Sequence, residues 1–178
     1  MARPDLTGVL LVGGASSRFG SPKALARLDG ETLADRSWRT LGEACGARLA
    51  VGKDSDGLDL PFPVLDDGSE TRAALAGLVA GLRAAPTDLC VVVPVDTPLV
   101  TSELLLELAE ACADAAVSQT GPLPGAYARS ALPVLERRLA DGRLALHEAL
   151  EELETSRIEL DPALLTNVNT PDELLRLG

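Results

Sequence analysis

The sequence has few aromatic residues, three cysteines and one histidine. Aromatic residues make up 2% of the 178 residues, so the core must be built mostly from Leu, Val and Ala. The single histidine, His147, excludes a metal site made of several histidines. Cys45, Cys90 and Cys112 form no C-x-x-C pair, which argues against a zinc or redox dithiol site and predicts reduced, mostly buried thiols.

Basic residues are also in the minority. The net charge is −11, with 27 acidic against 16 basic side chains, which argues against a general nucleic-acid binder because Lys and Arg supply affinity for the phosphate backbone. The first residues, MARPD, lack the apolar segment of a signal peptide, and no apolar stretch reaches the roughly 18 residues of a membrane span. We therefore expect a cytoplasmic protein that contacts neither nucleic acid nor membrane, and whose anionic ligands would need a local cationic site.

Short apolar runs alternate with segments of helical periodicity, and the length suits one domain over residues 1–178. Four strand-then-helix units in succession predict an α/β fold with a mostly parallel sheet. We expect Gly46 to end the first helix and Ser102 to cap the helix that starts there. The expected strands are residues 6–12, 48–51, 63–65, 89–93 and 115–118, the expected helices lie near residues 32–45, 74–82, 102–112 and 130–153, and residues 119–125 are expected to be a Gly/Pro loop.

Glycines or aspartates follow the ends of the first four expected strands. They are Gly13-Gly14, Gly52, Asp66-Asp67 and Asp96. In open α/β sheets, ligands bind outside the carboxyl ends of the strands, so these residues should converge on one rim.

The first of these loops, in the stretch LVGGASSRFGSPKAL, matches no generic phosphate motif. The spacing fits neither the Walker A pattern nor G-x-G-x-x-G, and no glycines bracket a serine as a nucleophile elbow requires. What remains is a glycine pair that exposes backbone N–H groups, followed by Arg18 and Lys23. Lys23 is one of two lysines in a chain with 14 arginines, which suggests a need for a compact ammonium. These residues alone leave two interpretations open, a phosphate site and an ordinary surface lysine.

Asp96 also allows two interpretations, and they are compatible. It directly follows an expected buried strand and precedes Thr97-Pro98, so its side chain could bond its own backbone in a turn. It could equally be a ligand of Mg²⁺, which takes one or two protein carboxylates and completes its shell with water and substrate phosphates.

Together these motifs resemble the molybdenum cofactor guanylyltransferase (MobA-like) nucleotidyltransferase family over nearly the whole chain. Five motifs occur in the family's order, and the carrying residues are Leu11-Val12-Gly13-Gly14 with Arg18-Phe19-Gly20 and Lys23, Leu75-Ala76-Gly77, Val95-Asp96-Thr97-Pro98, Gly121-Pro122-Leu123, and Asn167-Val168-Asn169-Thr170-Pro171-Asp172-Glu173-Leu174. The resemblance implies a three-layer, Rossmann-like nucleotidyltransferase that joins GMP from GTP to molybdopterin carrying molybdenum and releases pyrophosphate.

The resemblance also implies roles for single residues. It places the nucleotide on Leu11, Val12, Gly13, Gly14, Lys23, Asp67 and Asp96, gives catalytic roles to Arg18, Lys23 and Asp96, puts Mg²⁺ on Asp96, and directs Asn167 and Asn169 toward the pterin substrate. Transient contacts with proteins that donate or accept the cofactor would follow. The chain departs from the family's pattern at Pro22, at Ala73-Ala74, and at Gly52, where the family has an Asn that helps bind the nucleotide.

Two other functions remain open from the sequence. One is cytidylyl transfer to the same pterin or another small nucleotidyl transfer, since the Asn at Gly52 is missing. The other is a non-catalytic nucleotide- or pterin-binding module, because a fold alone does not fix function.

Overall fold

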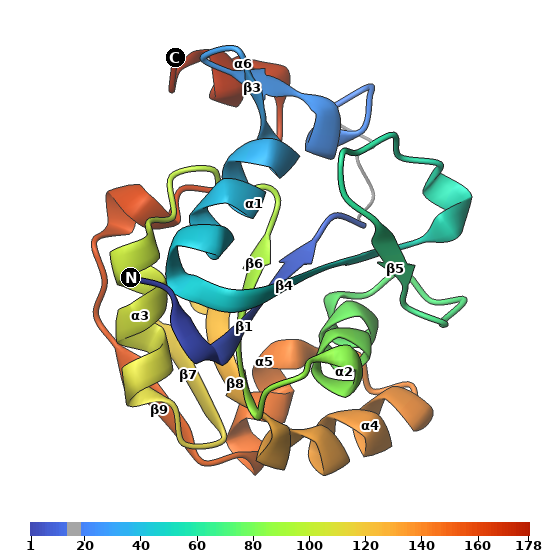
Figure 1. Cartoon of the computed structure of the whole chain (residues 1–178). Coiled ribbons are helices and arrows are strands. Elements are labelled where there is room, and N and C mark those ends of the chain that lie inside the picture. The colour runs from blue at the N-terminus through green and yellow to red at the C-terminus, as the bar shows by residue number, and fades with distance from the viewer. Residues whose placement is uncertain (14–18) are drawn as a thin grey trace.

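A seven-stranded sheet forms the centre of the computed structural model, which describes residues 1–13 and 19–178 (Figure 1). The strands are β1 (Arg3–Leu11), β2 (Arg27–Leu28), β3 (Glu31–Thr32), β4 (Cys45–Gly52), β5 (Val64–Asp66), β6 (Leu89–Pro94), β7 (Ala115–Ser118), β8 (Gly121–Ala128) and β9 (Thr155–Ile158). The order in the sheet is β5-β4-β1-β6-β8-β7-β9, while β2 and β3 form a separate hairpin. Strand β8 runs antiparallel to both neighbours, and every other pair in the large sheet is parallel.

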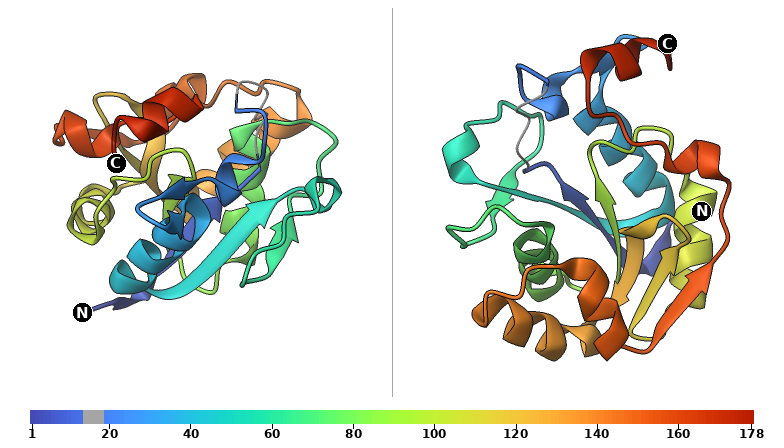
Figure 2. Two further views of the ribbon diagram at one scale, coloured as in Figure 1. Left: turned by 90° about the horizontal axis from the view of Figure 1, so that it is seen from above. Right: turned by 180° about the vertical axis from the view of Figure 1, so that it is seen from behind.

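Helices cover both faces of this sheet (Figures 1 and 2). The α-helices are α1 (Leu33–Ala44), α2 (Ala74–Ala84), α3 (Ser102–Ala111), α4 (Leu132–Ala140), α5 (Leu146–Ala149) and α6 (Pro171–Leu175), and the 3-10 turns are η1 (Lys23–Leu25), η2 (Asp54–Asp56), η3 (Arg129–Ala131), η4 (Leu150–Glu152) and η5 (Pro162–Leu165). Helices α1 and α3 pack on one face, and α2, α4 and α5 on the other. This confirms the predicted three-layer α/β fold with a mostly parallel sheet. Of the helices in the described ranges, none has the length and apolar character needed to cross a membrane.

Strand β1 lies in the middle of the sheet and is buried on both faces. Leu6 and Leu10 point into the layer of α1 and α3, whereas Val9 and Leu11 point into the layer of α2. Because both faces are covered, the strand needs a nearly continuous apolar run, and this is the pattern that predicted it.

Two glycines let α2 approach β1 closely. A Cβ atom at Gly77 would lie 2.9 Å from Leu11 Cδ2, and one at Gly81 would lie 2.7 Å from Val9 Cγ1. Real Cβ atoms do not approach other carbon atoms this closely, so larger residues would push α2 off the sheet. The close packing places the first turn of α2 beside the carboxyl end of β1.

The structure corrects two predicted helix boundaries. Helix α1 ends at Ala44, and Gly46 lies inside β4, where its missing side chain makes room for β1: a Cβ atom there would lie 2.7 Å from Pro4 Cα. Ser102 is the first residue of α3 and not its cap. The cap is Thr101, whose Oγ1 accepts a hydrogen bond from the Leu104 N–H at 3.3 Å.

Two larger elements also differ from prediction. The expected loop at residues 119–125 runs into β8, whose Gly125 pairs with both neighbouring strands. Pro122 and Pro124 lie where the ladder between β7 and β8 is irregular, which is where a sheet tolerates proline. The second expected strand–helix unit contains no α-helix, since residues 53–63 link β4 to β5 through η2 alone.

Candidate functional site

A cavity of about 480 Å³ opens where β1, β4, β5 and β6 end. Residues from all four strand ends line it, together with the start of α2 and the segment before α6; they include Leu11, Val12, Gly13, Lys23, Gly52, Lys53, Asp67, Arg72, Asp96 and Asn167. The strand-end rule predicted this convergence for Gly13, Gly52, Asp66, Asp67 and Asp96, and all of these except Asp66 line the cavity. Gly14 and Arg18, which the sequence also placed here, lie outside the described residues.

Bare backbone forms the wall of the cavity between β1 and β4. A Cβ atom at Gly13 would lie 3.2 Å from Gly52 Cα, so the backbone after β1 and the backbone at the end of β4 are in direct contact there, with no side chain between them. A Cβ atom at Gly52 would lie 2.9 Å from Val12 Cγ2, which leaves no room for an Asn at this position. In this conformation Gly52 therefore has no space for the Asn that the family resemblance implies at this position.

Lys23, Asp96 and Asn169 meet at one end of the cavity. Lys23 Nζ donates a hydrogen bond to Asn169 Oδ1 at 3.1 Å and lies 3.7 Å from Asp96 Oδ2. The side chains of Lys23 and Asp96 are 15% and 27% exposed. Burial raises the pKa of the Asp96 carboxyl above its ordinary value, and the nearby Lys23 ammonium acts in the opposite direction. The site thus combines one cation with one partly desolvated carboxylate.

The C-terminal segment is attached to the turn that carries Asp96. The Val168 N–H donates to the Asp96 carbonyl oxygen at 2.8 Å, and Val168 itself is fully buried. Asn167 and Asn169, on either side of Val168, are thereby held at the cavity and beside Lys23 respectively.

Asp96 could contribute to holding a divalent cation, but not alone. In residues 1–13 and 19–178, no group of three or more His, Cys, Asp or Glu side chains is arranged to bind a metal ion. A cation such as Mg²⁺ fits one carboxylate when substrate phosphates and water supply its other ligands. The donor set around Asp96 suits such a substrate-borne ion and does not suit a cage made by the protein.

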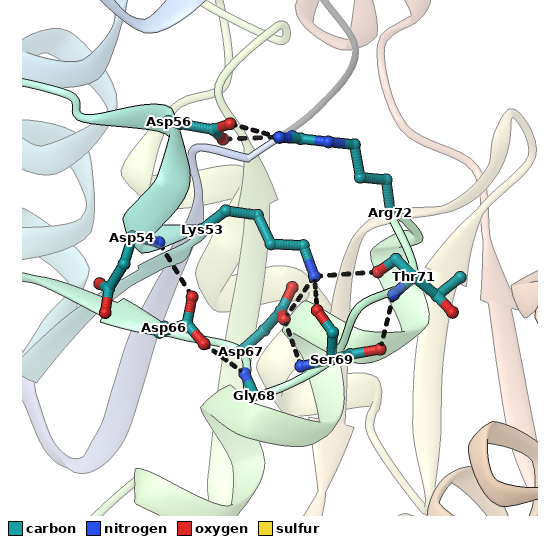
Figure 3. A network of polar contacts seen from close by, with 9 residues as sticks. All are labelled: Lys53, Asp54, Asp56, Asp66, Asp67, Gly68, Ser69, Thr71 and Arg72. Carbon is teal, nitrogen blue, oxygen red and sulfur yellow. Dashed lines mark hydrogen bonds and ion pairs between the residues drawn. The ribbon is translucent and has the colours of Figure 1, made fainter.

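A second lysine, Lys53, forms a network at the other end of the cavity (Figure 3). Its Nζ donates to Asp67 Oδ1 at 2.7 Å, to the Thr71 carbonyl oxygen at 3.0 Å, and to the Ser69 carbonyl oxygen. Asp67 Oδ1 also accepts from the Ser69 N–H at 2.9 Å. The side chains of Lys53 and Asp67 are only 9% and 7% exposed, so the ion pair lies in the wall of the cavity.

The neighbouring Asp66 has a different role from Asp67. Its Oδ1 accepts from the Asp54 N–H and its Oδ2 from the Gly68 N–H, both at 2.9 Å, and these hydrogen bonds lower its pKa. Asp66 therefore ties two loops together, whereas Asp67 lines the cavity.

The sequence reasoning missed Lys53 and Arg72. Arg72 lines the cavity, and its guanidinium binds both carboxylate oxygens of Asp56, at 2.5 and 3.3 Å. The signal for Lys53 was present, because the scarcity of lysine that singled out Lys23 applies equally to the only other lysine.

Comparisons with known proteins agree on one family. A family model described as the MobA-like NTP transferase domain matches residues 8–156. The chain is 32% identical to the probable molybdenum cofactor guanylyltransferase of Chloroflexus aggregans, covering 95% of this chain and 91% of that protein. It is 31% identical to the molybdenum cofactor guanylyltransferase of Desulfosudis oleivorans, with 95% and 92% covered. The crystal structure of molybdopterin-guanine dinucleotide biosynthesis protein A from Archaeoglobus fulgidus superimposes with a TM-score of 0.82 at 26% identity, covering 96% of both chains.

Proposed function

Since this chain belongs to the MobA-like NTP transferase family, we propose that it is a molybdenum cofactor guanylyltransferase, which transfers GMP from GTP to the phosphate of molybdopterin carrying molybdenum and releases pyrophosphate. The observation that carries the proposal is the similarity to guanylyltransferases over 95% of the chain. The cavity at the strand ends, with a lysine and a carboxylate at one end, supports it.

The triphosphate would lie at the Lys23 end of the cavity. Lys23 supplies positive charge there, and Gly13 leaves the backbone open to close approach by an anion. Leu11 and Val12 line the adjoining wall, where the nucleoside would pack. Gly14 and Arg18 would add to the same loop.

In the reaction, an oxygen of the terminal phosphate of molybdopterin attacks the α-phosphorus of GTP, and the bond to pyrophosphate breaks. Both reactants are anions, so the protein must offset their repulsion and fix their geometry, and it needs no covalent intermediate. Lys23 would stabilise negative charge on the triphosphate through the transfer. A phosphate nucleophile is already ionised at neutral pH, so no histidine base is required.

Asp96 would hold Mg²⁺ together with the substrate phosphates. When bound, the ion would neutralise charge on the phosphate oxygens. The partly buried Asp96 carboxylate fits this role because it lies in the cavity beside the lysine that would bind the same phosphates.

The pterin substrate would enter beside the C-terminal segment. Asn167 lines the cavity and Asn169 contacts Lys23, so both lie where a second substrate could reach the α-phosphate. Proteins that donate or accept the cofactor would then make contact near this opening.

Release of pyrophosphate tests the proposal directly. The purified protein is mixed with Mg²⁺, molybdenum-loaded molybdopterin and either GTP, CTP or ATP, and pyrophosphate and the dinucleotide product are measured. We expect product with GTP at least about tenfold faster than with CTP. A faster reaction with CTP would identify a cytidylyltransferase, and nucleotide binding without pyrophosphate release would identify a binding module.

A further inference from the structure

The ammonium of Lys53 is saturated by the protein itself. A lysine side chain has three N–H donors, and Lys53 Nζ has three acceptors, namely Asp67 Oδ1 and the carbonyl oxygens of Ser69 and Thr71. Lys53 could bind a phosphate only by giving up one of these hydrogen bonds. Its place in the cavity wall therefore points to a role other than holding the triphosphate.

The contacts of Lys53 fix one oxygen of Asp67 and leave the other open. Oδ1 accepts from both Lys53 Nζ and the Ser69 N–H, whereas Oδ2 accepts no hydrogen bond from residues 1–13 and 19–178 (Figure 3). In that part of the chain, Arg138 Nε is the one side-chain N or O atom that is both fully buried and without a hydrogen-bond partner. Asp67 Oδ2 also has no partner there, so it is not fully buried. Asp67 lines the cavity, so Oδ2 is an acceptor presented to a ligand in a fixed orientation.

The charges at this end of the cavity balance one another. Lys53 pairs with Asp67, and Arg72 pairs with Asp56. A phosphate here would meet the negative Oδ2 of Asp67, whereas an uncharged group with N–H donors would be bound by it. If the triphosphate lies at the Lys23 end, the group that reaches Asp67 is the base.

We propose that Lys53 is a positioning residue for base recognition, which turns Asp67 Oδ2 toward a base with adjacent N–H donors. Guanine fits, because its N1–H and 2-amino group lie side by side on one edge. Adenine and cytosine each offer only an amino group on the corresponding edge. The inference rests on the proposed guanylyl transfer and on the nucleotide contact that the family resemblance implies for Asp67, and it adds Lys53 as the residue that orients this carboxylate.

Lysine suits this position better than arginine. Three acceptors converge on one nitrogen, which a compact ammonium satisfies, while a guanidinium holds its donors in a planar fork. This accounts for a lysine here in a chain whose other cations, apart from Lys23, are arginines.

The first test removes the Lys53 ammonium with the substitution Lys53→Met. We expect the KM for GTP to rise roughly tenfold or more, because Asp67 Oδ2 is no longer held toward the base and the hydrogen bond between them is lost. The value of kcat should stay within about threefold of the parent's. The preference for GTP over ITP, which lacks the 2-amino group, should fall at the same time. Arg83→Met is the matched control, because it removes a cation of α2 that pairs with Glu136 outside the cavity. Circular dichroism and thermal unfolding establish that both variants fold.

The second test reverses the hydrogen-bonding character of the open atom with Asp67→Asn. Lys53 and the Ser69 N–H both donate to the Oδ1 side, so they would hold the amide oxygen there and turn Nδ2 toward the ligand. That variant should prefer XTP, whose base has a carbonyl oxygen where guanine has the amino group. Lys53→Met combined with Asp67→Asn should weaken the preference for XTP, because the Ser69 N–H alone then selects the orientation of the amide.

The outcomes separate the two proposals. A parent enzyme that uses GTP, with Lys53→Met leaving its GTP-to-ITP ratio unchanged or Asp67→Asn failing to favour XTP, would overturn the role of Lys53 and leave guanylyl transfer intact. A parent enzyme that prefers CTP would overturn guanylyl transfer itself.

Discussion

The Val168 N–H donates a hydrogen bond to the carbonyl oxygen of Asp96, 2.8 Å away, and so joins the C-terminal segment to the turn after β6. Val168 is buried in the core while Asn167 beside it is exposed and lines the cavity. A residue far along the chain is thereby anchored next to the proposed phosphate end of the site. This arrangement predicts that changes at Asn167 act on substrate binding more than on folding.

Asn167→Ala should raise the KM for molybdopterin about tenfold and leave the KM for GTP within about twofold, because one hydrogen bond to a charged substrate would be lost. Steady-state kinetics with each substrate varied in turn measure both constants. Equal rises in the two KM values would contradict a role for Asn167 on the pterin side.

Lys23→Ala should keep the fold and lower turnover by roughly 10²-fold or more, by analogy with the removal of one preorganised charge-stabilising donor. Arg27→Ala is the control, since it removes an exposed cation four positions away whose guanidinium donates to the Gly30 carbonyl oxygen of its own hairpin. Activity of Lys23→Ala within about threefold of the parent would mean that Lys23 has no part in the transfer.

Asp96→Asn should lose the Mg²⁺-dependent turnover, because an amide is a neutral and weaker ligand for a hard cation. The rate is measured as a function of Mg²⁺ concentration with GTP held constant. If the variant kept the parent's Mg²⁺ dependence, the carboxylate would serve only the turn.

Asp66→Asn should lower the thermal unfolding midpoint at pH 7, because an amide nitrogen cannot accept one of the two N–H groups that Asp66 now binds. The lowered pKa of Asp66 means that its carboxylate stabilises the fold above the ordinary Asp pKa of about 4 and that this contribution is lost as the pH falls through the lowered value. The difference between variant and parent should therefore shrink in acid. Asp59→Asn, at an exposed position in the segment that precedes β5, is the control substitution.

Gly81→Ala should decrease the free energy of unfolding even though alanine favours helices. Helix propensity would stabilise the variant by about 1 kcal/mol, whereas forcing a methyl group against Val9 costs about 1–3 kcal/mol. Denaturant unfolding measures the difference. An increase in stability would mean that β1 and α2 can separate at no cost.

The sequence predicted the elements whose burial leaves a recognisable apolar pattern. It did not predict elements whose conformation depends on contacts between segments far apart in the chain. Helix α2 was visible because its apolar positions repeat with the helical period, and strand β1 because its apolar run is nearly continuous. Strand β8 was not, because two prolines and two glycines read as a loop until the ladder around them is known. Gly46 resembled a helix terminator, yet the structure requires a glycine there because a Cβ atom would collide with Pro4 on the neighbouring strand β1.

The candidate site divides in the same way. The strand ends identified Gly13, Gly52, Asp67 and Asp96 as neighbours, because parallel strands bring their carboxyl ends to one edge. The contacts of Lys53 could not be predicted, since two of its three acceptors are backbone carbonyl oxygens of a loop whose course no sequence pattern specifies.

The touching backbones of Gly13 and Gly52 also bear on how this chain could have diverged from its relatives. An Asn at position 52 is accommodated only if Val12 moves away and Val64 also shifts, because a Cβ atom there would lie 2.9 Å from Val12 Cγ2 and 3.3 Å from Val64 Cγ1. The glycine and the two valines therefore form an epistatic set, in which a single substitution to the Asn that the family resemblance implies is disfavoured until the neighbours change. A lineage that acquired this set would be held to glycine, and selection for nucleotide affinity would act on other residues of the cavity.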